Sequence, residues 1–418
     1  MKLNLLKDKK ILILGFGQEG QDTYNFLRRL FPDKILGVAD QKKIPTSNFK
    51  LSKINWHLGD DYLKAVKKYD LIIKSPGVPF KILPKSCLKK ITSQTKIFFD
   101  NYAGKIIGIA GTKGKGTTSS LIYSILKEGG YNAYLIGNIG KPVLSFLLKN
   151  KKNNIFVYEL SSFQLMDLEK SPEIAVLVNN YPDHLDYHKN LQEYINANAN
   201  ITKYQTKDDY LIYNSQEEIT RKIAKKSNAQ KIGVKASGLK LNQGLAREVG
   251  KIFKISEKKI QAGIKKFKPQ PHRLELVGTY QGITFYDDSA ATIPEATLNA
   301  LDILSNKVQT LILGGSDKGS IYKNLAQRIL KSKIKTLILF PPTGEQILKA
   351  ILSANKNKKL PLQYFLAQDM KEAVKLAYLK TEKKKVCLLS PAAASFGIFR
   401  NYHHRGHLYK YYVKKYSY

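Results

Sequence analysis

An apolar run, a glycine-rich turn and a helical pattern follow one another without a break between residues 106 and 125. The apolar run is centred on Ile107, the turn reads GTKGKGTT from Gly111 to Thr118, and apolar residues then return at helical spacing. A strand, glycine-rich turn and helix in this order hold a phosphate on backbone N–H groups at the helix N-terminus, with a lysine over it. The sequence therefore predicts an α/β sheet with a phosphate-binding loop, in which Lys115 reaches the terminal phosphates of a nucleotide.

This turn departs from the standard phosphate-loop pattern at two positions. Ile109 stands where the first glycine is expected, and Gly116 stands where the Mg²⁺-binding hydroxyl is expected. The strand and the helix on either side still favour a phosphate loop over a glycine turn with an incidental lysine.

The first hundred residues alternate between strand and helix patterns, which is typical of a parallel, doubly wound sheet. Strands are predicted over 10–14, 35–39 and 70–74, and helices over 22–30 and 62–68. The first strand ends in GFGQEG from Gly15 to Gly20, with Asp40 twenty residues further on. This spacing matches the dinucleotide-binding fingerprint, although the pattern alone is a weak signal and does not favour NAD.

The same alternation restarts at Gly104 and again after a linker-like segment, Pro269–Arg273. The middle part predicts helices over 119–128 and 257–266 and strands over 131–136, 155–160 and 174–179; the last part predicts strands over 284–286, 310–313, 336–340 and 386–389. Polar clusters follow these strands, and ligands bind at the carboxyl ends of strands in open α/β sheets. We therefore predict three α/β units with a binding site at each sheet edge.

Composition places limits on the partners of this 418-residue chain. The net charge of +37 suggests nucleic acid, but only eight of the 70 basic residues are arginine, and the lysines are scattered as on solvated faces. We expect no specific nucleic-acid binding, whereas polyanionic nucleotides would be attracted. The two cysteines fit neither a disulfide scaffold nor a zinc site, and no segment is long enough to span a membrane. A soluble cytoplasmic protein is expected.

Three polar features allow more than one interpretation. Glu159 at the end of an apolar run suits a Mg²⁺ ligand better than a core salt bridge. His184 either binds a second cation or caps its loop. The run from Tyr402 to His407, YHHRGH, resembles a metal-binding pattern, but without a nearby cysteine and with aromatic residues following at helical spacing it favours a surface helix.

The ordered set of motifs resembles the ATP-dependent Mur ligases over essentially the whole chain, from Gly15 to Gly406. The motifs that carry the resemblance are GTKGK at 111–115, GNIGKP at 137–142, ELSSFQ at 159–164, Asp183-His184, PHR at 271–273, Asp288-Ser289, Gly314-Gly315, Lys318 and SPAAAS at 390–395.

The resemblance implies three domains and one reaction. The domains would be a Rossmann-like UDP-substrate domain (1–101), a central ATPase domain with a mainly parallel sheet (102–270) and a Rossmann-like amino-acid domain (271–418). The reaction would be an ADP-forming ligation of D-glutamate to UDP-N-acetylmuramoyl-L-alanine through an acyl phosphate, with ATP and Mg²⁺, in peptidoglycan precursor synthesis. A monomer is expected.

The resemblance also implies roles for individual residues. Catalysis would rest on Lys115, Glu159, His184 and Lys318, and Mg²⁺ would be held by Thr117, Glu159 and His184. ATP would be held by Gly111, Thr112, Lys113, Gly114, Lys115, Gly116, Thr117, Thr118, Arg273 and Asp288. The UDP substrate would be held by Phe16, Gln18, Asp40, Ser75, Asn138, Ser161 and Gln164, and D-glutamate by Thr292, Lys318, Ser395, Phe396 and Tyr402.

Three residues depart from the family pattern. Gly116 replaces the loop hydroxyl, which Thr117 would supply instead; Asn198 stands where the family has a carbamylated lysine that bridges a second metal; and Ala290 stands where a lysine follows Asp-Ser. These changes keep a non-catalytic nucleotide-binding relative as an alternative. A folylpolyglutamate synthase-like ligase is a second alternative, disfavoured because its phosphate loop lies near the start of the chain.

Overall fold

The computed structural model describes residues 2–43, 53–137, 143–148, 153–184, 187–267, 271–317, 320–356, 358–395 and 397–418. Contacts within the chain divide it into two compact units, Met1–Phe267 and Lys268–Tyr418. Asn138, Lys318 and Phe396 lie outside the described residues. The three segments that the sequence distinguishes each build one sheet, whereas the domain boundaries near 101 and 270 remain predictions.

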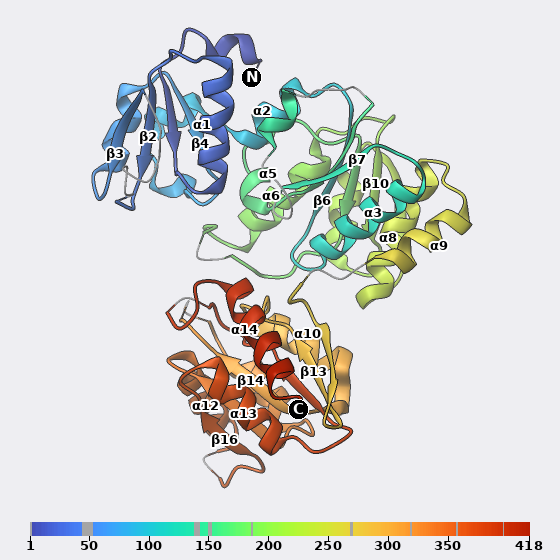
Figure 1. Ribbon diagram of the computed structural model, residues 1–418. Coiled ribbons are helices and arrows are strands. Elements are labelled where there is room, and N and C mark those ends of the chain that lie inside the picture. The colour runs from blue at the N-terminus through green and yellow to red at the C-terminus, as the bar shows by residue number, and fades with distance from the viewer. Residues whose placement is uncertain are drawn as a thin grey trace. The chain divides into compact units, whose positions relative to one another are not determined.

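The first sheet is parallel throughout and has the order β3-β2-β1-β4-β5 (Figure 1). Its two central strands, β1 and β4, are buried along their whole length, as their continuous apolar sequence predicts for a sheet covered on both faces. The predicted helix at 62–68 is a 3₁₀ helix, and the strands β3 and β5, which lack a clear apolar run, were not predicted. The strands are Ile54–Leu58 (β3), Leu36–Asp40 (β2), Ile11–Leu14 (β1), Leu71–Lys74 (β4) and Ile91–Ser93 (β5), with helices Gln18–Leu30 (α1) and Tyr62–Lys68 (η3).

The second sheet, also parallel, has the order β11-β10-β9-β6-β8-β7. Helix α3 packs against α8 and α9, and α6 packs against α5 (Figure 1). Its strands are Gln230–Val234 (β11), Tyr210–Asn214 (β10), Ile174–Leu177 (β9), Lys105–Ala110 (β6), Ile155–Glu159 (β8) and Ala133–Gly137 (β7). Its helices are Lys115–Glu128 (α3), Leu144–Leu147 (α4), Ser162–Leu165 (α5), Leu191–Lys203 (α6), Glu218–Lys226 (α7), Gly238–Ile252 (α8) and Glu257–Lys266 (α9).

The first two sheets share one hydrophobic core through helix α2 (Gln94–Asn101). The Phe98 ring of α2 packs edge-on against Phe156 and Tyr158 of β8, at centroid distances of 5.2 and 5.9 Å. Thr95 Oγ1 and the Tyr158 hydroxyl lie 3.1 Å apart in this buried contact. These contacts explain why residues up to Phe267 form a single compact unit.

The third sheet has the order β12-β13-β17-β14-β15-β16 and is parallel except for the β12–β13 hairpin. Its strands are Glu275–Tyr280 (β12), Ile283–Asp287 (β13), Val308–Gly314 (β14), Thr336–Phe340 (β15), Gln363–Leu366 (β16) and Val386–Leu389 (β17). Its helices are Pro294–Leu304 (α10), Lys323–Leu330 (α11), Thr343–Ala354 (α12), Met370–Lys380 (α13) and Tyr402–Lys415 (α14).

Helix α14 confirms the helix predicted at YHHRGH, and one face of it is buried. The helix is present, but Arg405, Gly406, Tyr409 and Val413 are buried along one face. Arg405 tolerates burial because its guanidinium donates to backbone carbonyls, including Ser289 O at 2.7 Å and Ala393 O at 3.1 Å. No apolar run in the sequence marks this part of the buried face.

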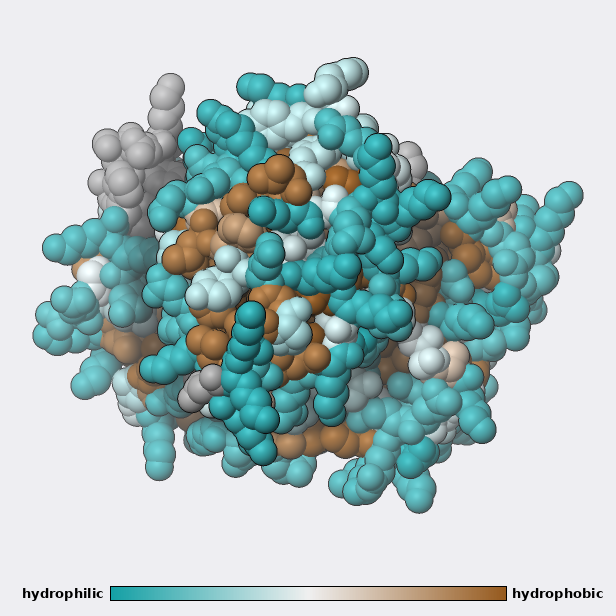
Figure 2. Space-filling model, turned by 90° about the horizontal axis from the view of Figure 1, so that it is seen from below, coloured by the Kyte–Doolittle hydropathy of each residue, from teal (hydrophilic) through white to brown (hydrophobic). Residues whose placement is uncertain are grey.

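The surface agrees with the expectation of solvated lysines. Figure 2 shows one face of the molecule covered mainly by hydrophilic residues, with smaller hydrophobic areas between them. Lys74 is an exception, since only 2% of this residue is exposed. Among the described residues, no helix combines the length and the apolar character that a membrane span requires.

Candidate active site

The turn from Gly111 to Gly114 has the backbone conformation of a phosphate loop. Gly111 and Gly114 have φ of +130° and +82°, and a Cβ at Gly111 would lie 2.7 Å from the Asn179 carbonyl oxygen. Only glycine is compatible with that combination. The turn ends at the first residue of α3, so the backbone N–H groups at the start of α3 face the loop.

The loop is fixed to the carboxyl end of β9. The Asn179 side chain accepts the Lys113 N–H at 2.8 Å and donates to the Lys113 carbonyl at 3.0 Å. Thr112 Oγ1 lies 2.7 Å from the Tyr194 hydroxyl of α6 and accepts the Tyr181 N–H at 2.8 Å. Side chains on two neighbouring elements thus hold the turn in one conformation.

Lys115 lies across this turn. Its ammonium donates to the carbonyl oxygens of Gly111 at 2.7 Å and Thr112 at 3.1 Å. The ammonium therefore lies against the turn and lines the pocket beside it, and its contact with a bound phosphate stays a prediction.

The two threonines after Gly116 differ in their surroundings. Thr118 is fully buried, and its hydroxyl donates to Asn242 Oδ1 of α8 at 3.2 Å. Thr117 is half-buried. Thr117 is thus the better candidate for the hydroxyl that Gly116 lacks.

Glu159 and His184 follow neighbouring strands of the same sheet. Glu159 is the last residue of β8, is 5% exposed, and pairs in register with Ile109, two residues before the loop. His184 follows β9 with a φ of +54°, and its ring packs edge-on against Phe163 at 4.8 Å. A hydroxyl and a carboxylate beside a phosphate loop are the hard oxygen donors that Mg²⁺ prefers, so Thr117 and Glu159 fit that ion, with His184 near the same pocket.

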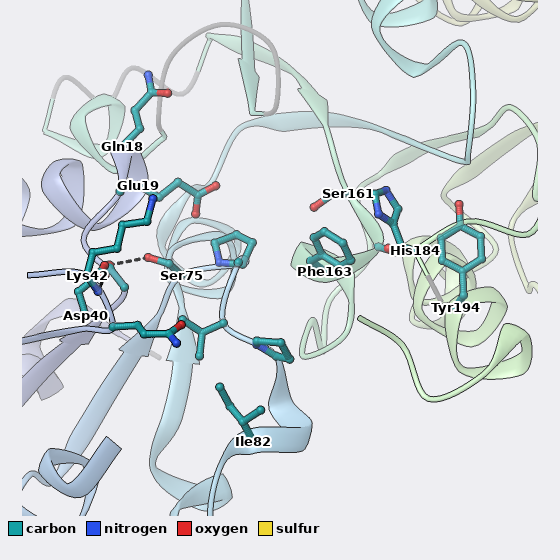
Figure 3. Close-up of a pocket in the computed structure, with 18 of the residues that line it drawn as sticks. Gln18, Glu19, Asp40, Lys42, Ser75, Ile82, Ser161, Phe163, His184 and Tyr194 are labelled. Atoms are coloured by element: carbon teal, nitrogen blue, oxygen red, sulfur yellow. Dashed lines mark hydrogen bonds between the residues drawn. The ribbon is translucent and has the colours of Figure 1, made fainter. Parts of the chain in front are cut away.

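A pocket of about 700 Å³ opens beside the loop. In Figure 3, Gln18 at the start of α1, Asp40 at the end of β2 and Ser75 after β4 lie on one side of the pocket. Ser161, Phe163, His184 and Tyr194 lie across the pocket from them. Gly111 and Lys115 also line it. The pocket therefore brings residues predicted for the UDP substrate and residues predicted for ATP and Mg²⁺ into one cavity.

Two predicted substrate residues have other environments. The Phe16 side chain is 3% exposed and packs against Tyr24 and Trp56, so only its backbone N–H, which donates to Asp40 Oδ2 at 2.7 Å, faces the glycine-rich turn. Gln164 is 2% exposed; it forms a capping box with Ser161 and donates to Glu19 Oε1 at 2.9 Å.

Glu19 is a pocket residue that the sequence analysis missed. It lines the pocket from α1, and burial raises its pKa to about 7 against the hydrogen bond from Gln164 and the charge of Lys74. Burial also lowers the pKa of Lys74 to about 8, against the nearby carboxylates of Asp167 and Glu19. No local pattern distinguishes Glu19 from a solvated helix residue, because its burial depends on the second sheet.

A second group of predicted residues lies in the unit Lys268–Tyr418. Asp288 is 8% exposed; it accepts the Leu274 N–H at 3.0 Å and the Ser390 hydroxyl at 2.7 Å, and burial raises its pKa to about 7. Ser395 is also buried, Thr292 and Tyr402 are half-buried, and Arg273 is exposed. Asp288 and Ser395 follow the carboxyl ends of the adjacent strands β13 and β17, where ligands bind in such sheets.

Comparison with known proteins gives consistent matches along the chain. The profile of the Mur ligase middle domain matches residues 109–281, and that of the Mur ligase, glutamate ligase domain matches residues 272–393. A UDP-N-acetylmuramoylalanine–D-glutamate ligase from Acetivibrio thermocellus is 33% identical, over 97% of this chain and 96% of the relative. The enzyme of the same name from Clostridium tetani is 32% identical, over 96% of both chains. This chain belongs to the Mur ligase family.

Solved structures show the same fold for this Mur ligase. MurF from Thermotoga maritima, solved in complex with ADP, has a TM-score of 0.61 at 14% identity and covers 99% of this chain and 97% of its own. MurC from the same organism has a TM-score of 0.59 at 16% identity and covers 98% and 99%. A folylpolyglutamate synthase from Mycobacterium tuberculosis covers only 72% of this chain, with a TM-score of 0.55. Members of the family form amide bonds with ATP, so the chain is an ATP-dependent ligase.

Asn198, the residue predicted to stand in place of the family's lysine, has a buried environment in this ligase. It lies on α6, one turn after Tyr194, is fully buried, and donates to Asn180 Oδ1 at 2.8 Å. Among the described residues, Asn198 Oδ1 and Asn180 Nδ2 have no hydrogen-bond partner although both are buried. Lys203 is exposed, with its ammonium over the Tyr204 ring, so it does not take the place of a lysine at 198.

Proposed function

We propose that this Mur ligase joins D-glutamate to UDP-N-acetylmuramoyl-L-alanine in peptidoglycan precursor synthesis, using ATP and Mg²⁺ in the cytoplasm as a monomer. The observation that carries the substrate assignment is the pocket that unites Asp40 and Ser75 with Lys115 and His184. A substrate with a nucleotide at one end and a carboxylate at the other suits a cavity with a glycine-rich turn on one side and a phosphate loop on the other. The names of the relatives support the same choice.

The reaction would proceed in two displacements. The substrate carboxylate attacks the γ-phosphorus of ATP, and ADP leaves with the electrons of the broken P–O bond. The D-glutamate amine then attacks the acyl carbon, loses a proton, and releases inorganic phosphate as the amide bond forms. Both steps gather negative charge, which fixed cations and N–H groups stabilise.

The chain supplies several of these groups. Lys115 and the N–H groups at the start of α3 would stabilise the transferring phosphoryl group. Mg²⁺, held by Thr117, Glu159 and His184, would neutralise phosphate oxygens. In the other unit, Arg273 and Asp288 would hold ATP, and Thr292, Ser395 and Tyr402 the D-glutamate carboxylates, together with Lys318 and Phe396.

Phosphate release tests this assignment directly. Purified protein with ATP, Mg²⁺ and UDP-N-acetylmuramoyl-L-alanine is expected to release phosphate with D-glutamate and not with L-glutamate, D-aspartate or glycine. Turnover with a folate substrate and L-glutamate would favour the folylpolyglutamate synthase alternative. Absence of turnover with every substrate would favour the non-catalytic alternative.

The glycine-rich turn at Gly15 is predicted to bind uridine nucleotides and not NAD. Both Asp40 oxygens already accept backbone N–H groups, from Phe16 at 2.7 Å and Lys42 at 2.8 Å, so the carboxylate is committed to the turn itself. Calorimetry on the full chain should detect UDP and give no heat with NAD. Asp40→Asn, which cannot accept both N–H groups through oxygen, should weaken UDP binding; NAD binding without UDP binding would contradict the proposal.

Because Asn198 stands at the predicted position of the carbamylated lysine, we expect the ligation reaction not to depend on bicarbonate. A neutral amide cannot be carbamylated, so depletion of bicarbonate should leave the rate of ligation unchanged. The measurement is phosphate release in CO₂-free buffer with and without added bicarbonate, for the wild-type chain and for Lys203→Ala. Bicarbonate rescue that disappears in Lys203→Ala would show that Lys203 carries the carbamate instead.

A further inference from the structure

Three histidines of the unit Lys268–Tyr418 gather beside α14, the helix that contacts both strands of the β12–β13 hairpin. The buried His272 ring contacts the His407 ring at a centroid distance of 4.8 Å and the His403 ring at 5.4 Å. His403 and His407 are four residues apart on one helix, so they lie on the same face one turn apart. Both are exposed, whereas His272 is fully buried.

The closeness of these rings depends on a glycine. A Cβ at Gly406 would lie 2.1 Å from His272 Nδ1, so only glycine lets the imidazole rest against the helix between the two other histidines. The proposed ATP residues Arg273 and Asp288 do not take part in these ring contacts.

His272 has one nitrogen in use and one without a partner. Its Nδ1 lies 2.7 Å from Asp287 Oδ2, and an ionised carboxylate can only accept, so Nδ1 carries the proton. Its Nε2 then carries a lone pair, and this nitrogen is buried without a hydrogen-bond partner among the described residues. A carboxylate that orients a histidine through one nitrogen, with the other nitrogen available, is the usual support of a metal-binding histidine.

The distances from the His272 ring to the two other rings agree with one shared ion. Two imidazoles on a tetrahedral Zn²⁺ with Zn–N bonds of about 2.0–2.1 Å have centroids about 5 Å apart. The observed 4.8 and 5.4 Å bracket that separation. Among the described residues, the nitrogens of the three histidines do not lie within 4.8 Å of one another, so binding requires a rotamer change of His403 and His407, which exposed side chains undergo on the picosecond to nanosecond timescale.

A neighbouring group meets the spacing of a metal site but is better explained as a hydrogen-bond network. Among the described residues, His272, Glu275 and Asp287 place ligand atoms within 4.8 Å of one another. Glu275 Oε2 accepts the backbone N–H of His272 at 2.8 Å, and both Glu275 oxygens accept hydrogen bonds from the Lys410 ammonium at 3.0 Å. These oxygens are occupied by donors, which leaves His272 Nε2 as the available ligand atom.

We propose that His272, His403 and His407 form a binding site for Zn²⁺ or a similar divalent transition-metal ion, with Asp287 orienting His272 and water completing the coordination. Imidazole nitrogens suit this class of ion, whereas Mg²⁺ prefers oxygen. The site would fasten the first turns of α14 to the β12–β13 hairpin. It is separate from the proposed ligase function and does not rest on it.

Zinc titration of the full chain tests the site. Protein stripped with a chelator and held in excess Mg²⁺ is titrated with Zn²⁺ against a chromophoric chelator. We expect one Zn²⁺ per chain and a rise in Tm on binding. His403→Ala and His407→Ala, both exposed positions, should each weaken Zn²⁺ binding about tenfold or more, since loss of even an outer partner costs about 10–100-fold.

A neighbouring histidine provides a matched control. His404 lies between the two proposed ligands and accepts the Arg400 N–H at 3.3 Å through Nδ1. His404→Gln keeps an acceptor there and should leave Zn²⁺ affinity and the zinc-dependent rise in Tm unchanged. Zinc binding that persists in the double variant His403→Ala/His407→Ala, that is lost in His184→Ala instead, or that is absent from the wild-type chain would overturn the proposal.

Discussion

Lys115→Ala is expected to lower the rate of ATP-dependent ligation about 10²–10³-fold, the usual cost of losing one donor to a charged transition state. The ammonium contacts the loop carbonyls of Gly111 and Thr112 and packs no core, so the fold should survive. Phosphate release under saturating substrates measures the rate, and circular dichroism checks the fold.

Lys127→Ala is the matched control for this variant. Lys127 lies on the same helix, α3, but near its C-terminal end and exposed to solvent. Its replacement removes the same charge from the chain and should leave the rate unchanged. Near-normal turnover of Lys115→Ala, or an equal loss in both variants, would contradict the assignment of the phosphate loop.

Arg405→Met is expected to destabilise the unit Lys268–Tyr418 by about 3–5 kcal/mol, the range for removing one member of a buried charged network. The Arg405 guanidinium donates to Ser289 Oγ at 3.0 Å, to Ser289 O at 2.7 Å and to the carbonyls of Ala393 and Ala394 at 3.1 and 3.3 Å. Burial lowers the pKa of Arg405 to about 9, against the nearby carboxylates of Asp287 and Asp288. Methionine fills the volume but leaves these acceptors unsatisfied.

The fluorescence of the single tryptophan distinguishes unfolding of one unit from unfolding of the other. Trp56 lies in β3 of the unit Met1–Phe267, so its fluorescence follows unfolding of that unit alone. Urea unfolding followed by circular dichroism should lose stability in Arg405→Met, whereas the transition seen by Trp56 should stay in place. The stability of Arg405→Lys should lie between those of the wild type and Arg405→Met, because an ammonium keeps the charge but cannot reproduce the planar arrangement of the guanidinium donors. The exposed Arg400→Met should match the wild type; an unchanged circular-dichroism transition in Arg405→Met would refute the expectation.

The sequence predicts many of the buried strands because an apolar run is a local feature, whereas strands such as β3, β11, β12 and β16 were not predicted. The apolar runs 336–340 and 386–389 are strands with the predicted bounds. In β8, the polar residue Glu159 follows the apolar run 155–158, as expected. Helices α1 and α3 begin four residues earlier than predicted, since glycine and polar residues of the turns already belong to their first turns.

What the sequence could not predict depends on distant partners. Glu19 is a pocket carboxylate whose pKa is raised by burial, against the hydrogen bond that it accepts from Gln164, a residue far along the chain. Arg405 is a buried residue only because carbonyls near residues 289 and 393 surround it. Phe16 shows the converse: the fingerprint around it predicts a ligand contact, but the ring fills the core between Tyr24 and Trp56.

The anchoring of the phosphate loop has a thermodynamic consequence for nucleotide affinity. Fixing the backbone of one residue costs about 1–2 kcal/mol of conformational entropy, and a flexible loop would incur that cost when the nucleotide binds. Here Asn179 already holds Lys113 at both its N–H and its carbonyl, and Tyr194 and Tyr181 hold Thr112. Ordering of the loop is therefore part of the free energy of folding, and the contacts made to an incoming triphosphate can appear almost undiminished as affinity.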